Sequence, residues 1–230
     1  MLKKVFEKMF FKSYRLNEKN ILSFLDINKD AKILDLGCND GSWTIKLAEK
    51  IKTNNIYGID IVDERLEMAK KNGVTTTKGD LNAKFPFEDN FFDVIHANQV
   101  IEHIAFLDNF ISEIQRILKP GGYVIISTEN ASSWHNIFAS VLGWQIFSLT
   151  NISSKKSGIG NPLAIHSGET MQLSSWTHKT IFNYRGLKDF FSTYDFTNPS
   201  IKGAGYYPLP SYFGKLDPRH SHFITLKAYK

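Results

Sequence analysis

The sequence predicts an α/β protein in which a mostly parallel, seven-stranded sheet carries helices on both faces. Between residues 31 and 128, strand patterns alternate with helix patterns, and this alternation requires a parallel sheet with right-handed crossovers. Segment 122–128 is apolar nearly throughout, as expected for a strand that is covered on both faces. The apolar run 33–36 leads directly into a turn of small residues that opens a helix, which is typical of a ligand site at the carboxyl end of a sheet.

Residues 1–26 are predicted to form an amphipathic helix, because Ile21, Leu22 and Leu25 recur at helical spacing between lysines. We expect residues 1–30 to form a helical cover over the edge of the sheet or over the opening of the ligand site. The alternating region that follows contains predicted helices near 42–51, 63–72 and 106–118 and predicted strands at 32–36, 56–60, 74–77, 91–97 and 122–128. The turn at 119–122 ends the last of these helices, since proline cannot continue it and glycine accepts a left-handed cap.

The alternation breaks after residue 128. Segment 129–178 holds aromatic residues, histidines and polar turns around one predicted helix near 133–142, and we expect it to be an insertion that serves as a lid or binding segment. Regular structure then resumes with a helix at 180–192, a strand near 195–202, a loop at 203–214 and a last strand at 222–229. The predicted organisation is a single domain over residues 1–230.

Composition excludes several classes of protein. The 230 residues are 42% hydrophobic and 22% charged, as in ordinary soluble globular proteins. We find no apolar run long enough to cross a bilayer and no signal peptide, and we therefore expect a cytoplasmic protein. The single cysteine, Cys38, excludes internal disulfides and thiolate metal clusters. The net charge of +5 is spread along the chain without an arginine-rich stripe, so it does not argue for nucleic acid.

Acids and glycines stand where three predicted strands end. The first strand leads into the turn at 35–41 (DLGCNDG), the second ends at Asp60, and the third is followed by Asp80. Glycines allow backbone N–H groups and a helix N-terminus to approach a ligand closely. The turn lacks the Gly-x-Gly-x-x-Gly spacing of dinucleotide sites, which favours a single nucleoside over a pyrophosphate.

These motifs resemble those of the class I S-adenosylmethionine-dependent methyltransferases, in particular the small-molecule group that contains the ubiquinone-biosynthesis O-methyltransferases. The resemblance implies a Rossmann-like, doubly wound sheet with S-adenosyl-L-methionine as the cofactor. It implies that the turn at 35–41 approaches the amino-acid part of the cofactor. It also implies that Asp60 holds the ribose hydroxyls and that Asp80 binds the adenine amino group. The cofactor-binding residues implied in this way are Asp35, Gly37, Cys38, Asn39, Gly41, Asp60, Ile61, Asp80, Leu81, Ala97, Asn98 and Gln99.

One residue departs from the motif of this family. Asn39 stands where the middle glycine is usual. Asparagine is the non-glycine residue that most readily adopts a positive φ, so we expect the turn to form.

A hydroxyl acceptor requires a base, and histidine is the natural choice near neutral pH. His103, just past the fourth strand, and His135, after the fifth, are the candidates for catalysis. Each candidate also has a structural alternative. Glu102 and His103 could cap the next helix, and His135 could belong to a helix start that is capped by a serine. His166 and His178 lie in the insertion, where a lone histidine is more often solvated than catalytic.

The sequence argues against a required metal. In the ubiquinone-biosynthesis enzymes that the chain resembles, a Glu-x-x-Glu-His segment is associated with a divalent metal. Gln99 stands at the first of these positions, which leaves Glu102 and His103. Two ligands make a poor site for a hard cation that prefers several oxygens.

The predicted function is methyl transfer to a small-molecule, sugar or lipid-linked acceptor, with O-methylation favoured. The aromatic residues of the insertion suit a ring, an isoprenoid tail or a sugar face, and they include Trp134, Trp144, Phe147 and Trp176. The basic, amphipathic start permits at most peripheral membrane contact, and the chain is expected to be a monomer or a homodimer. Two alternatives stay open: a catalytically silent cofactor-binding protein, and a nucleic-acid methyltransferase. The second is disfavoured because positions 97–100 read ANQV in place of an Asn/Asp-Pro-Pro-Tyr/Phe motif.

Overall fold

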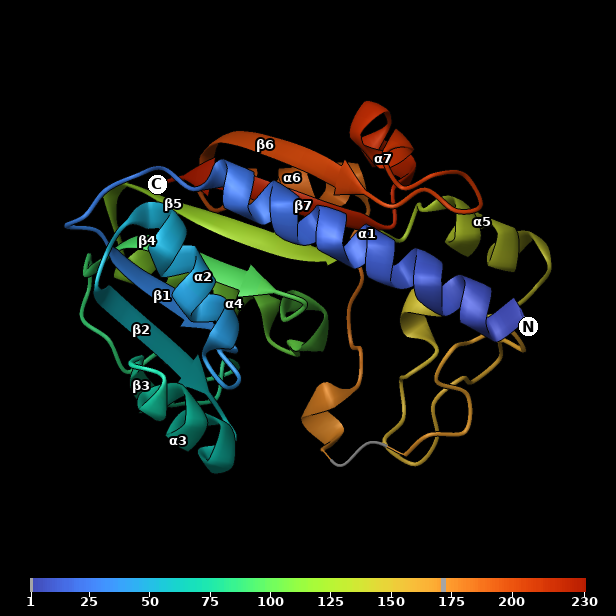
Figure 1. The fold of residues 1–230 in the computed structure, drawn as a ribbon, viewed down its shortest axis with the longest axis horizontal. Coiled ribbons are helices and arrows are strands. Elements are labelled where there is room, and N and C mark those ends of the chain that lie inside the picture. The colour runs from blue at the N-terminus through green and yellow to red at the C-terminus, as the bar shows by residue number, and fades with distance from the viewer. Residues whose placement is uncertain (1, 171–172) are drawn as a thin grey trace.

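The fold is a single seven-stranded sheet between two layers of helices (Figure 1). The computed structural model describes residues 2–170 and 173–230. Its strand order is β3-β2-β1-β4-β5-β7-β6, and only β7 runs antiparallel to its neighbours within this sheet. The predicted fold class, mostly parallel and doubly wound, is confirmed.

The strands lie close to their predicted positions, with one exception. They are β1 (Lys32–Leu36), β2 (Asn55–Asp60), β3 (Thr75–Lys78), β4 (Phe92–Asn98), β5 (Leu118–Glu129), β6 (Thr197–Ala204) and β7 (Phe223–Tyr229). The exception is β5, which begins four residues before the predicted start at 122. Its register with β4 shifts between the pairs Phe92–Leu118 and Val94–Tyr123, so the proline-glycine turn is absorbed as an irregularity of the strand.

The helices also follow the predicted order. They are α1 (Leu2–Phe24), α2 (Ser42–Ile51), α3 (Asp63–Lys71), α4 (Leu107–Ile117), α5 (Trp134–Val141), α6 (Tyr184–Thr193) and α7 (Phe213–Leu216). Helix α6 starts four residues later than predicted because the side chain of Asn183 caps it, accepting a hydrogen bond from the Gly186 N–H at 2.7 Å. Helix α7, a single short turn after β6, is an element that the sequence analysis did not predict.

Two apolar cores lie on opposite faces of the sheet. On one face, α4 and α6 bury residues such as Phe110, Ile114 and Phe191 against the strands. On the other, α1 and α2 bury residues such as Ile21 and Leu47. Complete burial of a large apolar side chain stabilises the fold by about 1.5–3 kcal/mol, so these two cores fix the positions of the strand ends.

Helix α1 crosses the sheet near β7 and β5, and polar contacts hold it there (Figure 1). Asn17 donates a hydrogen bond to the Ser127 hydroxyl at 2.7 Å and accepts one from the Thr225 hydroxyl at 2.7 Å. Asn17 also donates to the side chain of Asn98, at the end of β4. Helix α1 therefore packs on the sheet, although the side chains of residues 1–6 lie outside the described ones. No helix among the described residues is long and apolar enough to span a membrane.

The segment between β5 and α6 is largely irregular. Its short helical pieces are α5, η2 (Phe147–Leu149) and η3 (Ser174–Trp176). The strands β1, β2 and β4 point toward this insertion, so their carboxyl ends and the insertion face each other (Figure 1).

Candidate active site

A cavity of about 250 Å³, here called the strand-end cavity, opens where β1, β2 and β4 end. Nine of the residues predicted for the site line it: Gly37, Asn39, Asp60, Ile61, Asp80, Leu81, Asn98, Gln99 and His103. Four separate stretches of sequence thus meet in one wall, as expected for a ligand site at the carboxyl edge of a parallel sheet.

The turn after β1 depends on left-handed backbone conformations. Gly37 has a φ of +74°, and a Cβ atom there would lie 2.9 Å from Cγ2 of Val100. The turn and the segment after β4 therefore approach closely only with glycine at this position. Asn39 has a φ of 50°, which confirms that asparagine adopts the conformation required of the missing glycine.

Two carboxylates of the strand-end cavity are held in fixed orientations. Asp60 accepts hydrogen bonds from the N–H groups of Asn39 at 3.1 Å and Val62 at 3.0 Å. A carboxylate has about four lone-pair sites, so these two bonds leave acceptor capacity for the hydroxyls of a ligand. Asp80 accepts two hydrogen bonds from Asn82 on Oδ1 alone.

Gln99 has an unfavourable backbone conformation and an unpaired side-chain donor, and a ligand would satisfy the donor. Its φ is 57°, a left-handed conformation that is unusual for glutamine. Its side-chain Nε2 is buried and has no hydrogen-bond partner among the described residues. An unsatisfied buried donor costs about 1–3 kcal/mol. An acceptor atom of a ligand in the strand-end cavity would satisfy this donor, so the residues present fit a polar nucleoside-type ligand.

Four predicted cofactor residues do not line the strand-end cavity, namely Asp35, Cys38, Gly41 and Ala97. The buried Asp35 carboxylate accepts hydrogen bonds from the Thr44 hydroxyl at 2.6 Å and from Nδ1 of His96 at 2.7 Å. His96 is therefore a packed residue of β4 that is held by this carboxylate. A Cβ atom at Gly41 would lie 3.0 Å or less from Ala69 and Val74, so this glycine packs the turn against α3.

Ala97 is buried in the core under α4 and α6, and Cys38 is buried in a smaller apolar cluster with Leu66, Ala69 and Val74. Together with Asp35 and Gly41, Ala97 and Cys38 support the cavity from behind its wall.

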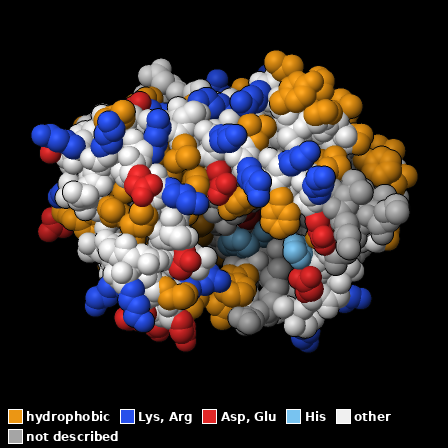
Figure 2. Space-filling model, in the orientation of Figure 1, with side chains coloured by type: hydrophobic (Ala, Val, Ile, Leu, Met, Phe, Trp, Pro, Cys, Tyr) orange, Lys and Arg blue, Asp and Glu red, His pale blue; other side chains and the backbone are white. Residues whose placement is uncertain are grey.

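A second cavity, of about 420 Å³, lies between the insertion, α1 and the end of β5, and is here called the apolar cavity. Figure 2 shows histidine side chains inside the hollow on this face of the molecule. Its walls are mainly hydrophobic and include Phe10 and Phe147. They also hold titratable groups, namely Glu129, His135, His166, Glu169, His178, Tyr207 and His222.

His135 lies in the wall of the apolar cavity with an unpaired nitrogen. Its Nδ1 is buried without a hydrogen-bond partner in the described part of the chain, and its Nε2 lies 3.4 Å from the Ser133 hydroxyl. Burial and the nearby His222 lower the pKa of His135 well below its ordinary value, so the ring is neutral near pH 7. Ser133 is the N-cap residue of α5, in agreement with the structural alternative, but its side chain makes no capping hydrogen bond.

Next to His135, a chain of polar groups joins Tyr207, His222 and Glu129. Nδ1 of His222 lies 3.0 Å from the Tyr207 hydroxyl, and its Nε2 lies 3.6 Å from Oε1 of Glu129. Burial alone would raise the pKa of Glu129, but hydrogen bonding and charge from His222 outweigh burial and lower it to about 2. Glu129 is therefore an ionised carboxylate, and its charge orients His222.

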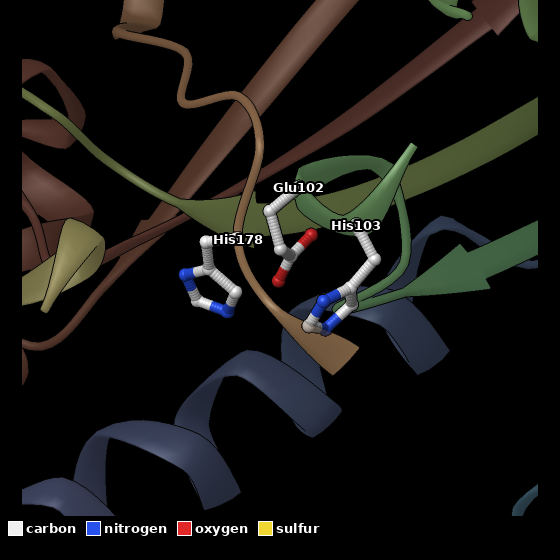
Figure 3. Close-up of side chains that lie close together, drawn as sticks. All are labelled: Glu102, His103 and His178. Atoms are coloured by element: carbon white, nitrogen blue, oxygen red, sulfur yellow. The ribbon is translucent and has the colours of Figure 1, made fainter. Parts of the chain in front are cut away.

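The side chains of Glu102, His103 and His178 lie close together (Figure 3) and join a wall of one cavity to a wall of the other. His103 lines the strand-end cavity and His178 the apolar cavity, and their ring centroids are 4.8 Å apart. Burial raises the pKa of Glu102 to about 8, and burial together with His178 lowers the pKa of His103 to about 4. Helix α4 begins with Phe106 as its cap, so the alternative role of Glu102 and His103 as helix caps is wrong.

The position of His178 was not predictable from the sequence, where a lone histidine in a loop is more often solvated than catalytic. Its Nδ1 lies 2.6 Å from the Ser148 carbonyl, and its ring contacts that of His103. The two histidines are 75 positions apart, and no local spacing relates them.

The four aromatic residues assigned to acceptor binding also separate in the structure. Phe147 lines the apolar cavity, whereas Trp176 lines the strand-end cavity, where its ring lies 4.7 Å from the Arg65 guanidinium. Trp134 and Trp144 line neither of these two cavities. Arg65, a wall residue of the strand-end cavity, had no signal in the sequence beyond its place in α3.

Comparisons with known proteins agree with this geometry. A family model described as a methyltransferase domain matches residues 5–201. Demethylmenaquinone methyltransferase from Staphylococcus aureus strain MRSA252 is 26% identical over 201 residues, which cover 84% of this chain and 78% of that protein.

Solved structures share the fold. An S-adenosylmethionine-dependent methyltransferase from Thermotoga maritima, described as a possible histamine N-methyltransferase, superposes with a TM-score of 0.63 at 18% identity and covers 98% of this chain and 94% of its own. Phosphoethanolamine N-methyltransferase 2 from Haemonchus contortus, in complex with S-adenosyl-L-methionine, has a TM-score of 0.59 at 16% identity. The match covers 94% of this chain and 51% of that chain. The predicted resemblance, cofactor and enzyme class are confirmed. The chain belongs to the methyltransferase domain family and is an S-adenosylmethionine-dependent methyltransferase.

Proposed function

We propose that the enzyme transfers the methyl group to a hydroxyl of an apolar, aromatic small molecule that occupies the apolar cavity, while the cofactor occupies the strand-end cavity. One observation carries this proposal: the ring of His103 in the wall of the strand-end cavity contacts the ring of His178 in the wall of the apolar cavity, with their centroids 4.8 Å apart. Reactants held in neighbouring cavities can be aligned for an in-line displacement.

The strand-end cavity supplies the groups that we assign to the cofactor. The backbone of the turn at Gly37 and Asn39 faces the amino-acid part, and Asp60 accepts hydrogen bonds from the ribose hydroxyls. Gln99 donates its unpaired Nε2–H to a carboxylate or hydroxyl of the cofactor, and Asp80 receives the adenine amino group. When bound, the cofactor supplies an electrophilic methyl group on a sulfonium.

We assign the removal of the acceptor proton to His135. The neutral ring has an unpaired, buried Nδ1, and it lines the apolar cavity. A base with a lowered pKa takes a proton efficiently only from a fairly acidic hydroxyl. This favours a phenolic or hydroxyquinone hydroxyl over a sugar hydroxyl as the acceptor.

The lining of the apolar cavity supports the same class of acceptor. Phe10, Phe147 and Leu163 offer apolar surface to a ring and its substituents, and the glutamates Glu129 and Glu169 also line the wall. The relative named demethylmenaquinone methyltransferase also points to a quinone-type ring. Lipid-linked acceptors with such a ring remain within this class.

The experiment uses the full chain with labelled S-adenosylmethionine and a panel of hydroxyquinones, apolar phenols, sugars, RNA and duplex DNA. We expect label in the apolar aromatic compounds, as an O-methyl group by mass spectrometry, with release of S-adenosylhomocysteine. Transfer only to sugars or nucleic acids, or to ring carbon alone, would contradict the proposal.

A variant connects this activity to the strand-end cavity. Gly37→Val places a branched side chain at a left-handed position beside Val100 and is expected to abolish cofactor binding while the chain stays folded. Calorimetry with S-adenosylhomocysteine measures the binding, and circular dichroism tests folding. Unchanged affinity in a folded variant would exclude this cavity as the cofactor site.

A further inference from the structure

The cluster of Glu102, His103 and His178 has the features of a metal site. One possible ligand atom from each side chain lies within 4.8 Å of the other two. Figure 3 shows the carboxylate between the two imidazole rings, with Glu102 and His103 on neighbouring positions and His178 on the segment that leads to α6. The three side chains therefore converge from two distant parts of the chain.

In both histidines, Nδ1 lies next to a backbone carbonyl, which leaves Nε2 as the nitrogen that could bind a metal. Nδ1 of His103 lies 3.2 Å from the Thr177 carbonyl, and Nδ1 of His178 lies 2.6 Å from the Ser148 carbonyl. A carbonyl only accepts hydrogen bonds, so Nδ1 carries the hydrogen in both rings and the lone pair is on Nε2. Metal-binding histidines are oriented in this way by an outer carbonyl or carboxylate.

Glu102 adds a buried oxygen that lacks a partner. Its Oε2 accepts a hydrogen bond from the Thr128 hydroxyl at 3.0 Å. Its Oε1 is buried and has no hydrogen-bond partner within the described ranges. A buried carboxylate oxygen is costly unless a donor or a cation satisfies it, and none of the described side chains does so.

Backbone hydrogen bonds hold the segment of His178 against the turn that carries Glu102 and His103. The N–H groups of Lys179 and Thr180 both donate to the Glu102 carbonyl, at 2.7 and 3.2 Å. The Lys179 ammonium donates to the His103 carbonyl at 3.0 Å. The segment that carries His178 is thus fastened to the turn that carries the other two side chains, and little ordering remains to be done on binding.

We propose that Glu102, His103 and His178 bind a divalent transition-metal ion such as Zn²⁺, with a coordination position open toward the apolar cavity. Two imidazoles and one carboxylate are the donor set of several catalytic zinc sites, whereas Mg²⁺ and Ca²⁺ prefer oxygen ligands. Ligand atoms of a tetrahedral zinc ion lie about 3.4 Å apart, so side-chain movements of about 1 Å close the site.

The expectation that no metal is required was based on two ligands, Glu102 and His103, and on a hard cation such as Mg²⁺. The third ligand, His178, is supplied by the insertion, and it changes both the number of ligands and the kind of ion that they prefer. The expectation that no metal is required for activity stays untested.

A cation at this junction would stand beside both cavities. It would polarise an acceptor hydroxyl and favour its ionised form, which is a common role of catalytic metals. This role rests on the proposed acceptor hydroxyl, whereas the binding of the ion does not.

The test is metal binding by the full chain after treatment with a chelator and its removal. Co²⁺ serves as a spectroscopic probe, because tetrahedral coordination gives intense visible absorption, and Zn²⁺ is titrated by calorimetry. We expect one ion per chain for each, displacement of Co²⁺ by Zn²⁺, and no saturable binding of Mg²⁺ over the same range. Absence of Co²⁺ absorption and of stoichiometric Zn²⁺ binding would overturn the proposal.

Three variants identify the ligands. His178→Ala and the nearly isosteric Glu102→Gln are expected to weaken Zn²⁺ binding at least tenfold. The matched control is His220→Ala, which removes a histidine that lies 2.7 Å from the Asp217 carboxylate but lines neither of the two cavities. Equal affinity in all three, with native circular dichroism, would contradict the assignment. S-adenosylhomocysteine binding by the chelated protein is measured separately, and its loss would count against the proposed function and not against the metal site.

Discussion

Gly37→Ala tests the turn after β1 with the smallest possible change. The substitution adds one methyl group at a position where φ is +74° and where a Cβ atom would lie 2.9 Å from Cγ2 of Val100. The N–H of Gly37 also donates to the Ile59 carbonyl at 2.8 Å, so the turn is tied to β2 and cannot move freely.

Two costs add in this variant. A left-handed conformation costs a non-glycine residue about 1–2 kcal/mol. Overpacking against Val100 adds about 1–3 kcal/mol. The total of about 2–5 kcal/mol is below the stability of most domains, so the chain should stay folded and relieve the strain by displacing the turn. Each 1.4 kcal/mol needed to restore the binding conformation weakens affinity tenfold, and we expect a loss of at least about thirtyfold for S-adenosylhomocysteine.

Gly121→Ala is the matched control for this variant. Gly121 has a φ of +79°, but a Cβ atom there would meet nothing within 4 Å. It carries the same backbone cost without the clash, and it lies outside both described cavities. Calorimetry should show wild-type affinity for this control and urea unfolding a loss of about 1–2 kcal/mol. The reasoning is refuted if Gly37→Ala binds S-adenosylhomocysteine as tightly as Gly121→Ala does.

Three further results are expected. Asp60→Asn keeps one acceptor oxygen but loses the charge, and it should weaken cofactor affinity about tenfold by calorimetry, a loss of about 1.4 kcal/mol, without changing Tm; an unchanged affinity would remove Asp60 from the site. His135→Asn should lower kcat about a hundredfold and leave cofactor affinity intact, as expected for a lost proton acceptor; unchanged kcat would exclude it. Since the pKa of Glu129 is lowered to about 2 in the folded state, its ionised form stabilises the protein above pH 4.5, and this contribution is lost as the pH falls toward 2. Glu129→Gln should therefore be less stable than the wild type by about 3 kcal/mol at pH 7 and by much less at pH 3 in urea unfolding, and a difference that is independent of pH would contradict this assignment.

The strands and their succession along the chain were predictable because most of them are defined by local pattern. Apolar periodicity located β1, β2 and β4, and the acids and glycines at their ends identified the carboxyl edge of the sheet. The start of β5 was not predictable, because Pro120 and Gly121 have the chemistry of a helix stop and a turn. The neighbouring strand β4 overrides that local preference by pairing with Leu118.

The junction of the two cavities could not be predicted from spacing. His178 reaches Glu102 only because backbone bonds from residues 179 and 180 hold the end of the insertion against the turn after β4. The same closure brings Trp176 to the strand-end cavity, although the sequence analysis grouped it with the acceptor-binding aromatics. Contacts of this kind depend on the tertiary arrangement of an irregular segment, which carries no periodicity.

A crystal structure of the full chain with bound S-adenosylhomocysteine tests most directly that the strand-end cavity holds the methyl donor. The expected result has ribose hydroxyls on the Asp60 carboxylate, the amino-acid part on the backbone near Gly37, and the sulfur directed toward the apolar cavity. A ligand bound elsewhere, or one whose sulfur points away from His103 and His178, would contradict the assignment of donor and acceptor to these two cavities.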